Sequence, residues 1–226
     1  MEVRFLGHSA FELKSDAATV LVDPFLTGNP KAAVAAADLE ADAILVTHGH
    51  ADHLGDTVDI AKRTGAPVVA IVELAGEIAR DGAPSTHDPN LGGTVNFDWG
   101  WVKLVPAWHT STTPKGQVNT PAGLVINIGG KTIYHLGDTA LFSDLALVNG
   151  RPSPLDLAIV PIGGHYTMDR HDAVEACRLV GAPHVIPCHF DTFPPIETDS
   201  AAFAAEAQAS ANCQVSVLKP GEALTL

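Results

Sequence analysis

The sequence has few basic residues, few cysteines and no long apolar run, and each shortage excludes a class of protein. Only 13 lysines and arginines stand against 26 acidic residues in 226, which leaves a formal charge of −13. Such a surface repels nucleic-acid phosphates and anionic lipid headgroups, so a general nucleic-acid or membrane-surface role is disfavoured. No apolar run approaches the roughly 20 residues that span a bilayer. Residues 1–8 are typical of a first strand and not of a signal peptide.

The three cysteines, Cys177, Cys188 and Cys213, are far apart and odd in number. They predict a reducing compartment, and therefore a cytoplasmic protein, without a disulfide framework. We interpret Cys188 as a small buried hydrophobe and not as a catalytic thiol. Hydrophobic residues make up 46% and charged residues 17%. This balance is globular, and the length suits a single domain over residues 1–226.

Short apolar, β-branched runs recur along the chain and indicate strands. They lie at 3–6, 19–22, 43–46, 68–71, 102–105, 124–128, 132–136, 157–160, 184–186 and 215–218. Helical patterns at 54–63, 73–80, 171–180 and 200–211 separate several of them, and residues 81–93 are predicted to form a long surface loop. Gly129-Gly130 is a hairpin signal. Strands alternate with helices in the outer thirds and follow one another in the middle, which favours an α/β sandwich with mixed sheets over a doubly wound sheet.

Potential metal ligands follow the predicted strands. His8, His48, His109, His165 and His189 each come after an apolar run, and so does Asp138. Binding sites in open α/β sheets form beyond the carboxyl ends of strands, so these side chains are expected to converge on one cleft.

The most specific motif is His48-Gly49-His50-Ala51-Asp52-His53. An extended chain places His48, His50 and Asp52 on one side, while His53 begins the following helix and approaches from another angle. Imidazole and carboxylate groups are ligands of Zn²⁺ and similar ions. A lone His-x-His is weak evidence, but this run directly after a buried strand predicts a metal site.

The other candidates have plainer alternatives. Taken singly, His109 and His189 are compatible with hydrogen-bonded structural histidines, and Asp138 is compatible with a turn or helix cap. Their strand-end positions, and the further ligands that a metal requires, favour a metal role for all three. His135 lies inside a predicted strand, where a structural role is favoured.

In this order, the HxHxDH run followed by His109, Asp138 and His189 resembles the metallo-β-lactamase superfamily. The resemblance implies a four-layer αβ/βα sandwich, with two mixed β-sheets flanked by helices and two divalent metal ions at one edge. It also implies the ligands. In that scheme the first metal is bound by His48, His50 and His109, the second by Asp52, His53 and His189, and both by Asp138. Zn²⁺ is the first choice of ion, with Mn²⁺, Fe²⁺, Co²⁺ and Ni²⁺ as alternatives.

Flanking segments, such as residues 5–11 and 188–196, resemble a prokaryotic branch of metal-dependent hydrolases similar to the ascorbate-6-phosphate lactonases. One departure is the segment Gly164-His165-Tyr166, where the branch more often carries an acidic residue and Asn-Phe. A histidine there adds an ionisable group near the expected cleft. Relatives often self-associate, so the resemblance leaves a homo-oligomer open.

Two cations bridged by Asp138 are expected to hold a hydroxide that attacks an ester, lactone or phosphodiester of a small molecule. Asp52 and Asp138 could orient the water or accept its proton. His8 and His165 are the candidates for proton delivery or oxyanion stabilisation, and for both an equal alternative is to orient a metal ligand. Asp23 is a candidate for the same orienting role.

Two other functions remain to be weighed. A nuclease of the same superfamily is disfavoured by the acidic charge, and an RNA-cleavage assay at varied salt would test it. A metal-binding regulatory protein that performs no hydrolysis would show metal content without turnover. Redox chemistry is disfavoured, because oxygen-reducing relatives carry Glu at the position of His50.

Overall fold

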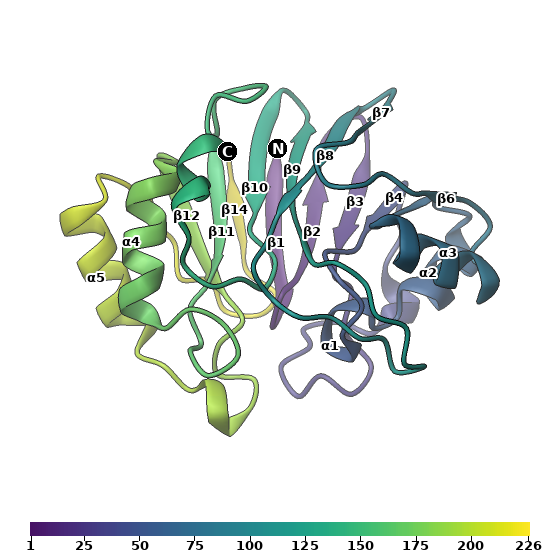
Figure 1. The fold of residues 1–226 in the computed structure, drawn as a ribbon, viewed down its shortest axis with the longest axis horizontal. Helices are drawn as coiled ribbons and strands as arrows, with labels where there is room; N and C mark the ends of the chain where they lie inside the picture. Colours follow the sequence, from purple (N-terminus) through teal and green to yellow (C-terminus); the bar gives the residue numbers. More distant parts are fainter.

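Two seven-stranded sheets lie face to face in this computed structural model, which describes residues 1–226 (Figure 1). The first sheet has the order β14 (Ala223–Thr225), β1 (Glu2–Gly7), β2 (Ala10–Lys14), β3 (Thr19–Val22), β4 (Ala43–Leu45), β5 (Val68–Val69) and β6 (Thr86–His87). The second has the order β13 (Gln214–Val215), β12 (His184–Cys188), β11 (Leu157–Pro161), β10 (Lys131–His135), β9 (Ala122–Ile128), β8 (Gly100–Pro106) and β7 (Thr94–Phe97).

Both sheets are mixed, and they share one pattern of pairing. In the first, the strands from β14 to β3 pair antiparallel and those from β3 to β6 pair parallel. In the second, β7 to β10 pair antiparallel and β10 to β13 pair parallel. The parallel strands need crossover connections, and these contain the main helices.

Helices cover the outer flanks of the two sheets (Figure 1). The first half supplies α1 (Ala51–Leu54), α2 (Thr57–Thr64) and α3 (Val72–Arg80), and the second half supplies α4 (Arg170–Val180) and α5 (Ser200–Ser210). Short 3₁₀ turns occur at Ala36–Asp38, Ser143–Leu147 and Pro194–Ile196. The α2–α3 pair and the α4–α5 pair lie at opposite ends of the view, with the strands between them. The expected αβ/βα sandwich of mixed sheets is confirmed.

Strand alternation builds the core, because successive side chains point to opposite faces. In β9, Leu124 and Ile126 belong to a cluster of 37 buried residues that also contains Val20 and Val22 of β3 and so joins the two sheets. Val125 belongs instead to a cluster of 20 buried residues under α4 and α5. Burying a side chain of this size contributes about 1.5–3 kcal/mol, so the sheets fix the strand ends firmly.

Local sequence explains α4. Its buried residues Ala173, Ala176, Cys177 and Val180 follow the i, i+3, i+4, i+7 spacing of one helix face. The side chain of Asp169 accepts hydrogen bonds from the backbone N–H groups of residues 171 and 172 at its start. The helix ends at a glycine in the left-handed region.

Several predicted element boundaries were wrong. The helix predicted over 54–63 is split, because α1 begins at Ala51 and ends at Leu54, where the following Gly55 has φ 41°. The loop predicted over 81–93 contains β6, whose Thr86 and His87 pair with β5. The last predicted strand, 215–218, is only Gln214–Val215, and the strands β2, β7 and β14 were missed. The hairpin at Gly129-Gly130 is confirmed, since β9 and β10 pair antiparallel across it.

Candidate metal centre

The loop after β4 carries His48 and His50 to one edge of the sandwich. His48 is fully buried, and its Nε2 lies 3.0 Å from Nδ1 of His50. The backbone between them is crowded. The Gly49 N–H donates to Ser111 Oγ at 2.8 Å, and a Cβ at Gly49 would lie 2.5 Å from Asn119 Nδ2. Glycine is therefore needed here for close approach.

Asp52 and His53 come from α1 and not from an extended run. The predicted alternation of His48, His50 and Asp52 is therefore wrong for Asp52, which lies in the first turn of the helix. The helix still directs both side chains to the same edge. His8 Nε2 lies 3.0 Å from Asp52 Oδ2, and His53 Nε2 lies 3.4 Å from Asp138 Oδ1.

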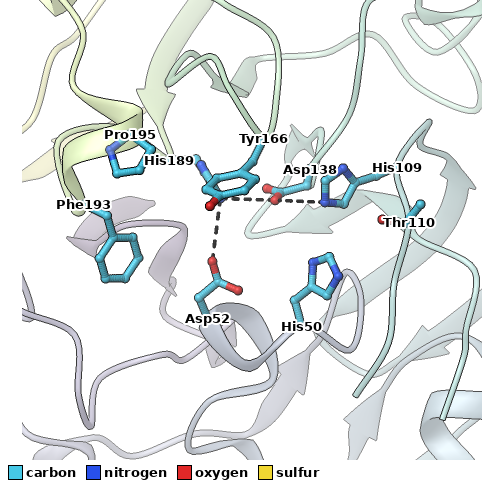
Figure 2. A pocket seen from close by; sticks show the side chains of 9 residues that line it. All are labelled: His50, Asp52, His109, Thr110, Asp138, Tyr166, His189, Phe193 and Pro195. Carbon is cyan, nitrogen blue, oxygen red and sulfur yellow. Dashed lines mark ion pairs between the residues drawn. The ribbon is translucent and has the colours of Figure 1, made fainter. Parts of the chain in front are cut away.

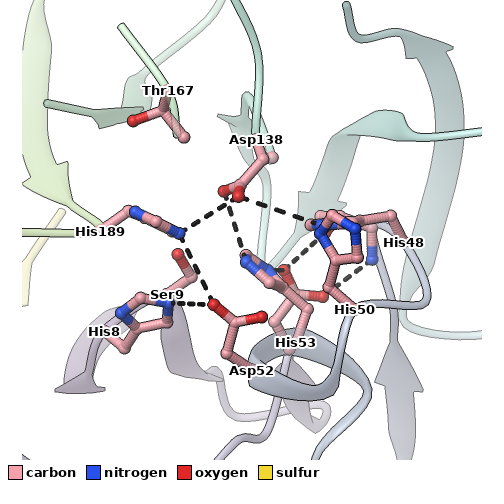
Figure 3. Close-up of polar contacts among 12 residues, drawn as sticks. His8, Ser9, His48, His50, Asp52, His53, Asp138, Thr167 and His189 are labelled. Carbon is pink, nitrogen blue, oxygen red and sulfur yellow. Dashed lines mark hydrogen bonds and ion pairs between the residues drawn. The ribbon is translucent and has the colours of Figure 1, made fainter. Parts of the chain in front are cut away.

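Three strand ends of the second sheet complete the cluster, and two of their side chains, Asp138 and His189, are labelled in Figure 3. His109 follows β8, Asp138 follows β10 and His189 follows β12. Asp138 lies among the imidazoles. Its Oδ2 is 3.1 Å from His189 Nε2, 3.6 Å from His109 Nε2 and 3.9 Å from His48 Nε2. The carboxyl ends of strands from both sheets thus meet at one point, as expected for an α/β site.

The donor atoms fall into groups that suit metal ions. Within each group they lie within 4.8 Å of one another, and the groups are His48, His50 and His109; His48, His53 and Asp138; and His8, Asp52, His53 and His189. Two buried atoms at the centre, His53 Nε2 and Asp138 Oδ1, have no hydrogen-bond partner. A buried polar atom without a partner is costly, so these facing atoms fit a cation that accepts their lone pairs.

The protonation states of three histidines and of Asp138 also suit ligation. Burial lowers the pKa of His48 well below its usual value, and burial likewise lowers the pKa of His50 and of His109. Neutral imidazole is the form that binds metals. For Asp138, burial favours the protonated acid, but His189 and His53 together hold its pKa well below the usual range. The carboxylate is therefore ionised at neutral pH.

Asp23 orients the imidazoles of His53 and His48 through hydrogen bonds to the Nδ1 side of each ring. Its Oδ2 accepts hydrogen bonds from His53 Nδ1 at 2.7 Å and from the Thr47 hydroxyl at 2.6 Å. The Thr47 oxygen in turn lies 3.0 Å from His48 Nδ1. With both Nδ1 atoms carrying hydrogen, both Nε2 atoms point towards Asp138. Because Asp138 and Asp23 raise the pKa of His53 well above its usual value, a bound cation would displace a proton from His53 Nε2.

His8 supports Asp52 in a similar way. Burial lowers the pKa of His8 to about 4, so the ring is neutral at pH 7. Because the Asp52 carboxylate can only accept, His8 Nε2 donates to it, and His8 Nδ1 accepts from the Thr192 hydroxyl at 2.9 Å. The His8 hydrogen bond and His53 together outweigh burial and lower the pKa of Asp52. His135 contacts the Ser9 carbonyl at 3.3 Å, away from the cavity.

A cavity of about 500 Å³ opens above the cluster (Figure 2). Its walls are formed by His50, Asp52, His109, Thr110, Asp138, Tyr166, His189, Phe193 and Pro195. His165 is not among them. It lies exposed on the surface, and its neighbour Tyr166 enters the cavity instead. Neither Tyr166 nor Phe193 was predicted from the sequence to have a role, although both stand in loops that also carry expected site residues.

The cysteines take no part in the site. All are free and buried, and burial raises the pKa of Cys188 well above its usual value. A thiol held in its protonated form is a poor nucleophile. The interpretation of Cys188 as a small buried hydrophobe agrees with its position.

A four-layer sandwich with histidine and aspartate donors at one edge defines a class of metal-dependent hydrolases. The chain belongs to the metallo-β-lactamase superfamily, because residues 18–190 match the family described as "Beta-lactamase superfamily domain". It is also similar to proteins named as metal-dependent hydrolases. The chain is accordingly a metal-dependent hydrolase.

The relatives match over their full length. A UPF0173 metal-dependent hydrolase from Thermus thermophilus is 48% identical over 227 residues, which cover 100% of this chain and 99% of the relative. One from Pelotomaculum thermopropionicum is 46% identical, with 100% of both covered. The solved structure of Igni18, a metallo hydrolase from Ignicoccus hospitalis, has a TM-score of 0.90 and 33% identity and covers 99% of this chain and 97% of its own. None of the helices in this chain is long and apolar enough to cross a membrane.

Proposed function

We propose that this chain binds two divalent cations, with Zn²⁺ as the first candidate, and hydrolyses an ester, lactone or phosphodiester of a small molecule. The observation that supports this most is the facing pair of buried atoms, His53 Nε2 and Asp138 Oδ1, which have no hydrogen-bond partner. Asp138 also lines the open cavity. The proposed ligands are His48, His50 and His109 for one ion and Asp52, His53 and His189 for the other, with Asp138 shared.

Divalent ions in such a site lower the pKa of a water molecule to about 7 and polarise the oxygen of the group under attack. The residues of the chain provide the rest. Asp52 and Asp138 have lowered pKa values, so both are ionised at neutral pH and orient a water molecule by accepting its hydrogen bonds. His8 touches Asp52 from behind and holds that carboxylate in place. We therefore assign His8 to positioning.

The position of the cavity fits a small substrate. It is walled on one side by Phe193 and Pro195 and on the other by His109 and Thr110, with the proposed ligands between them (Figure 2). A concave, partly apolar site with convergent polar groups is typical of small-molecule binding. The formal charge of −13 disfavours a polyanionic substrate.

The test combines a substrate panel with measured metal content. Asp138→Asn should lower turnover by at least about 100-fold, because it removes the shared carboxylate and its charge. Asp144→Asn, an exposed aspartate on the 3₁₀ turn Ser143–Leu147, is the matched control and should keep wild-type turnover. Full activity of the Asp138 variant, or full activity after the metals are removed, would contradict the proposal.

A further inference from the structure

Tyr166 enters the cavity with a free hydroxyl. The residue is 55% exposed and lines the cavity together with Asp138 and His189. The hydroxyl makes no hydrogen bond within the protein, whereas the Tyr166 N–H donates to the Gly164 carbonyl. Figure 2 shows the ring reaching in from the rim opposite Asp52 and His50. A phenol held over the reacting groups in this way is available to a substrate atom.

The loop that carries Tyr166 is fixed at both ends to segments that bear proposed ligands. The Gly164 N–H donates to the Met168 carbonyl at 2.9 Å, and the Met168 N–H donates to the Thr139 carbonyl, next to Asp138, at 3.2 Å. At the other end, a Cβ on Gly163 would lie 2.2 Å from the carbonyl oxygen of His189. These contacts fix the position of the Tyr166 loop relative to the proposed ligands Asp138 and His189.

His165 helps to hold the tyrosine ring. It has φ 52°, in the left-handed region, and it directly follows Gly164 at φ 66°. This conformation costs free energy at a non-glycine residue and turns the next side chain inwards. The His165 ring packs edge-on against Tyr166, with ring centroids 4.5 Å apart and an interplanar angle of 85°. His165 thus acts on the site through Tyr166.

The cavity offers apolar contacts and no cationic side chain. Phe193 and Pro195 form one wall of the cavity (Figure 2), and none of the residues that line the cavity is lysine or arginine. Phosphate groups are usually bound by arginine or lysine as well as by metals. The lining is therefore better matched to an uncharged substrate with an apolar substituent.

We propose that Tyr166 is a substrate-binding catalytic residue and that the substrate is an uncharged carboxylic ester or lactone. The Tyr166 hydroxyl donates a hydrogen bond to the carbonyl oxygen as that oxygen gains negative charge, and Phe193 and Pro195 enclose an apolar substituent. This inference rests on the proposed hydrolytic function and narrows it.

The reaction balances without a further reactant. The oxygen of water forms a bond to the acyl carbon, and the bond from that carbon to the alkoxy oxygen breaks. One water proton passes to the departing alkoxide, so that the products are a carboxylic acid and an alcohol, or a hydroxy acid from a lactone. Tyr166 keeps its own proton throughout and contributes only the hydrogen bond.

Kinetics of the metal-loaded protein provide the first test. We expect kcat/KM for p-nitrophenyl butanoate to exceed that for bis(p-nitrophenyl) phosphate. Tyr166→Phe should lower kcat for the butanoate ester by about 100-fold, the usual loss for one oxyanion donor, without changing metal content. The chain has only one other tyrosine, Tyr134, whose hydroxyl is buried in the core. Tyr134→Phe removes the same atom away from the cavity and should keep wild-type kcat.

Calorimetry provides a test that needs no turnover. Butanoate and hexanoate represent the acyl product, and hexanoate should bind the metal-loaded protein about tenfold more tightly because two further methylenes are buried. Phe193→Ala should remove most of this preference. Tyr166→Phe should weaken both carboxylates by about tenfold, since a hydrogen bond to a charged group is lost.

The outcomes separate this inference from the function it rests on. Hydrolysis with unchanged kcat in Tyr166→Phe, or a preference for the phosphate diester, would overturn the inference and leave the hydrolase proposal intact. Absence of turnover on every ester, with full metal content, would overturn the hydrolase proposal. In that case equal affinities for butanoate and hexanoate would also show that Phe193 and Pro195 do not bind an apolar substituent.

Discussion

At the scale of single residues, Asp23 connects the two halves of the proposed ligand set. It accepts directly from His53, and it reaches His48 through the Thr47 hydroxyl. In the proposed assignment these histidines bind different ions. One carboxylate outside the cavity therefore sets the tautomer of a ligand at each metal. Hydrogen-bond partners of this kind usually change metal affinity when they are replaced.

Asp23→Asn should weaken the binding of both metals by about 10–100-fold, because the amide keeps the volume but loses the charge that orients the rings. Competition with a chromophoric chelator would measure the affinity. The matched control is Asp156→Asn, which removes a carboxylate that also accepts a backbone and a side-chain hydrogen bond, from Thr132 and Lys131. Equal affinity in the two variants would show that Asp23 does not orient the ligands.

At the scale of elements, contacts between the loops that follow neighbouring strands set the positions of the proposed ligands. The close approach of Gly163 to the carbonyl oxygen of His189 joins the end of β11 to the end of β12. A side chain at residue 163 would meet backbone, which cannot move without displacing a proposed ligand. The loop that carries Tyr166 would shift with it.

Gly163→Ala should lower the free energy of unfolding by about 1–3 kcal/mol through overpacking, and should lower metal occupancy as well. Chemical denaturation and metal analysis would measure the two effects. Gly76→Ala in α3 is the control, because a Cβ there meets only Arg80 Nη1 at 3.5 Å. That change should stabilise the protein by about 0.5–1 kcal/mol, since alanine favours a helix interior. A stable, fully loaded Gly163 variant would contradict the proposed packing role.

The sequence predicted which side chains would lie close together better than it predicted the elements that carry them. His48, His109, Asp138 and His189 follow buried strands, and strand ends converge for a general topological reason. The helical position of Asp52 was not predictable from alternation, because the turn at Gly55 sets where α1 ends. Nor could sequence show that Tyr166 and not His165 enters the cavity, since the backbone angles at residues 164 and 165 decide it. The strand β14 was missed because its partner, β1, lies at the other end of the chain.

At the scale of the whole molecule, burial makes stability depend on pH. Desolvation lowers the pKa of several histidines, namely His8, His48, His50, His109 and His135. Below pH 6.5 these groups take up protons in the unfolded chain before they do so in the folded protein, which favours unfolding. His53 acts in the opposite sense, because Asp138 and Asp23 outweigh its burial and raise its pKa. The histidines with lowered pKa outnumber it.

The metal-free protein should therefore lose stability as the pH falls from 6.5 towards 4, where the folded His8 itself begins to accept a proton. Urea unfolding at pH 7.5, 6.0 and 5.0 would show a falling midpoint. The metal-loaded protein should lose more, because protons compete with the ions for the same nitrogen atoms. A midpoint that stays constant or rises between pH 6 and pH 5 would contradict this.

The proposed ligands are divided between the two halves of the chain. His48, His50, Asp52 and His53 belong to the first sheet and its helix, and His109, Asp138 and His189 to the second sheet. A chain emerging from the ribosome carries the first set long before the second exists. Neither sheet alone holds a complete set of proposed ligands. The chain therefore cannot hydrolyse a substrate through this site before the two sheets have packed together. Activity of the proposed site therefore requires that both halves of the chain have been synthesised and packed together correctly.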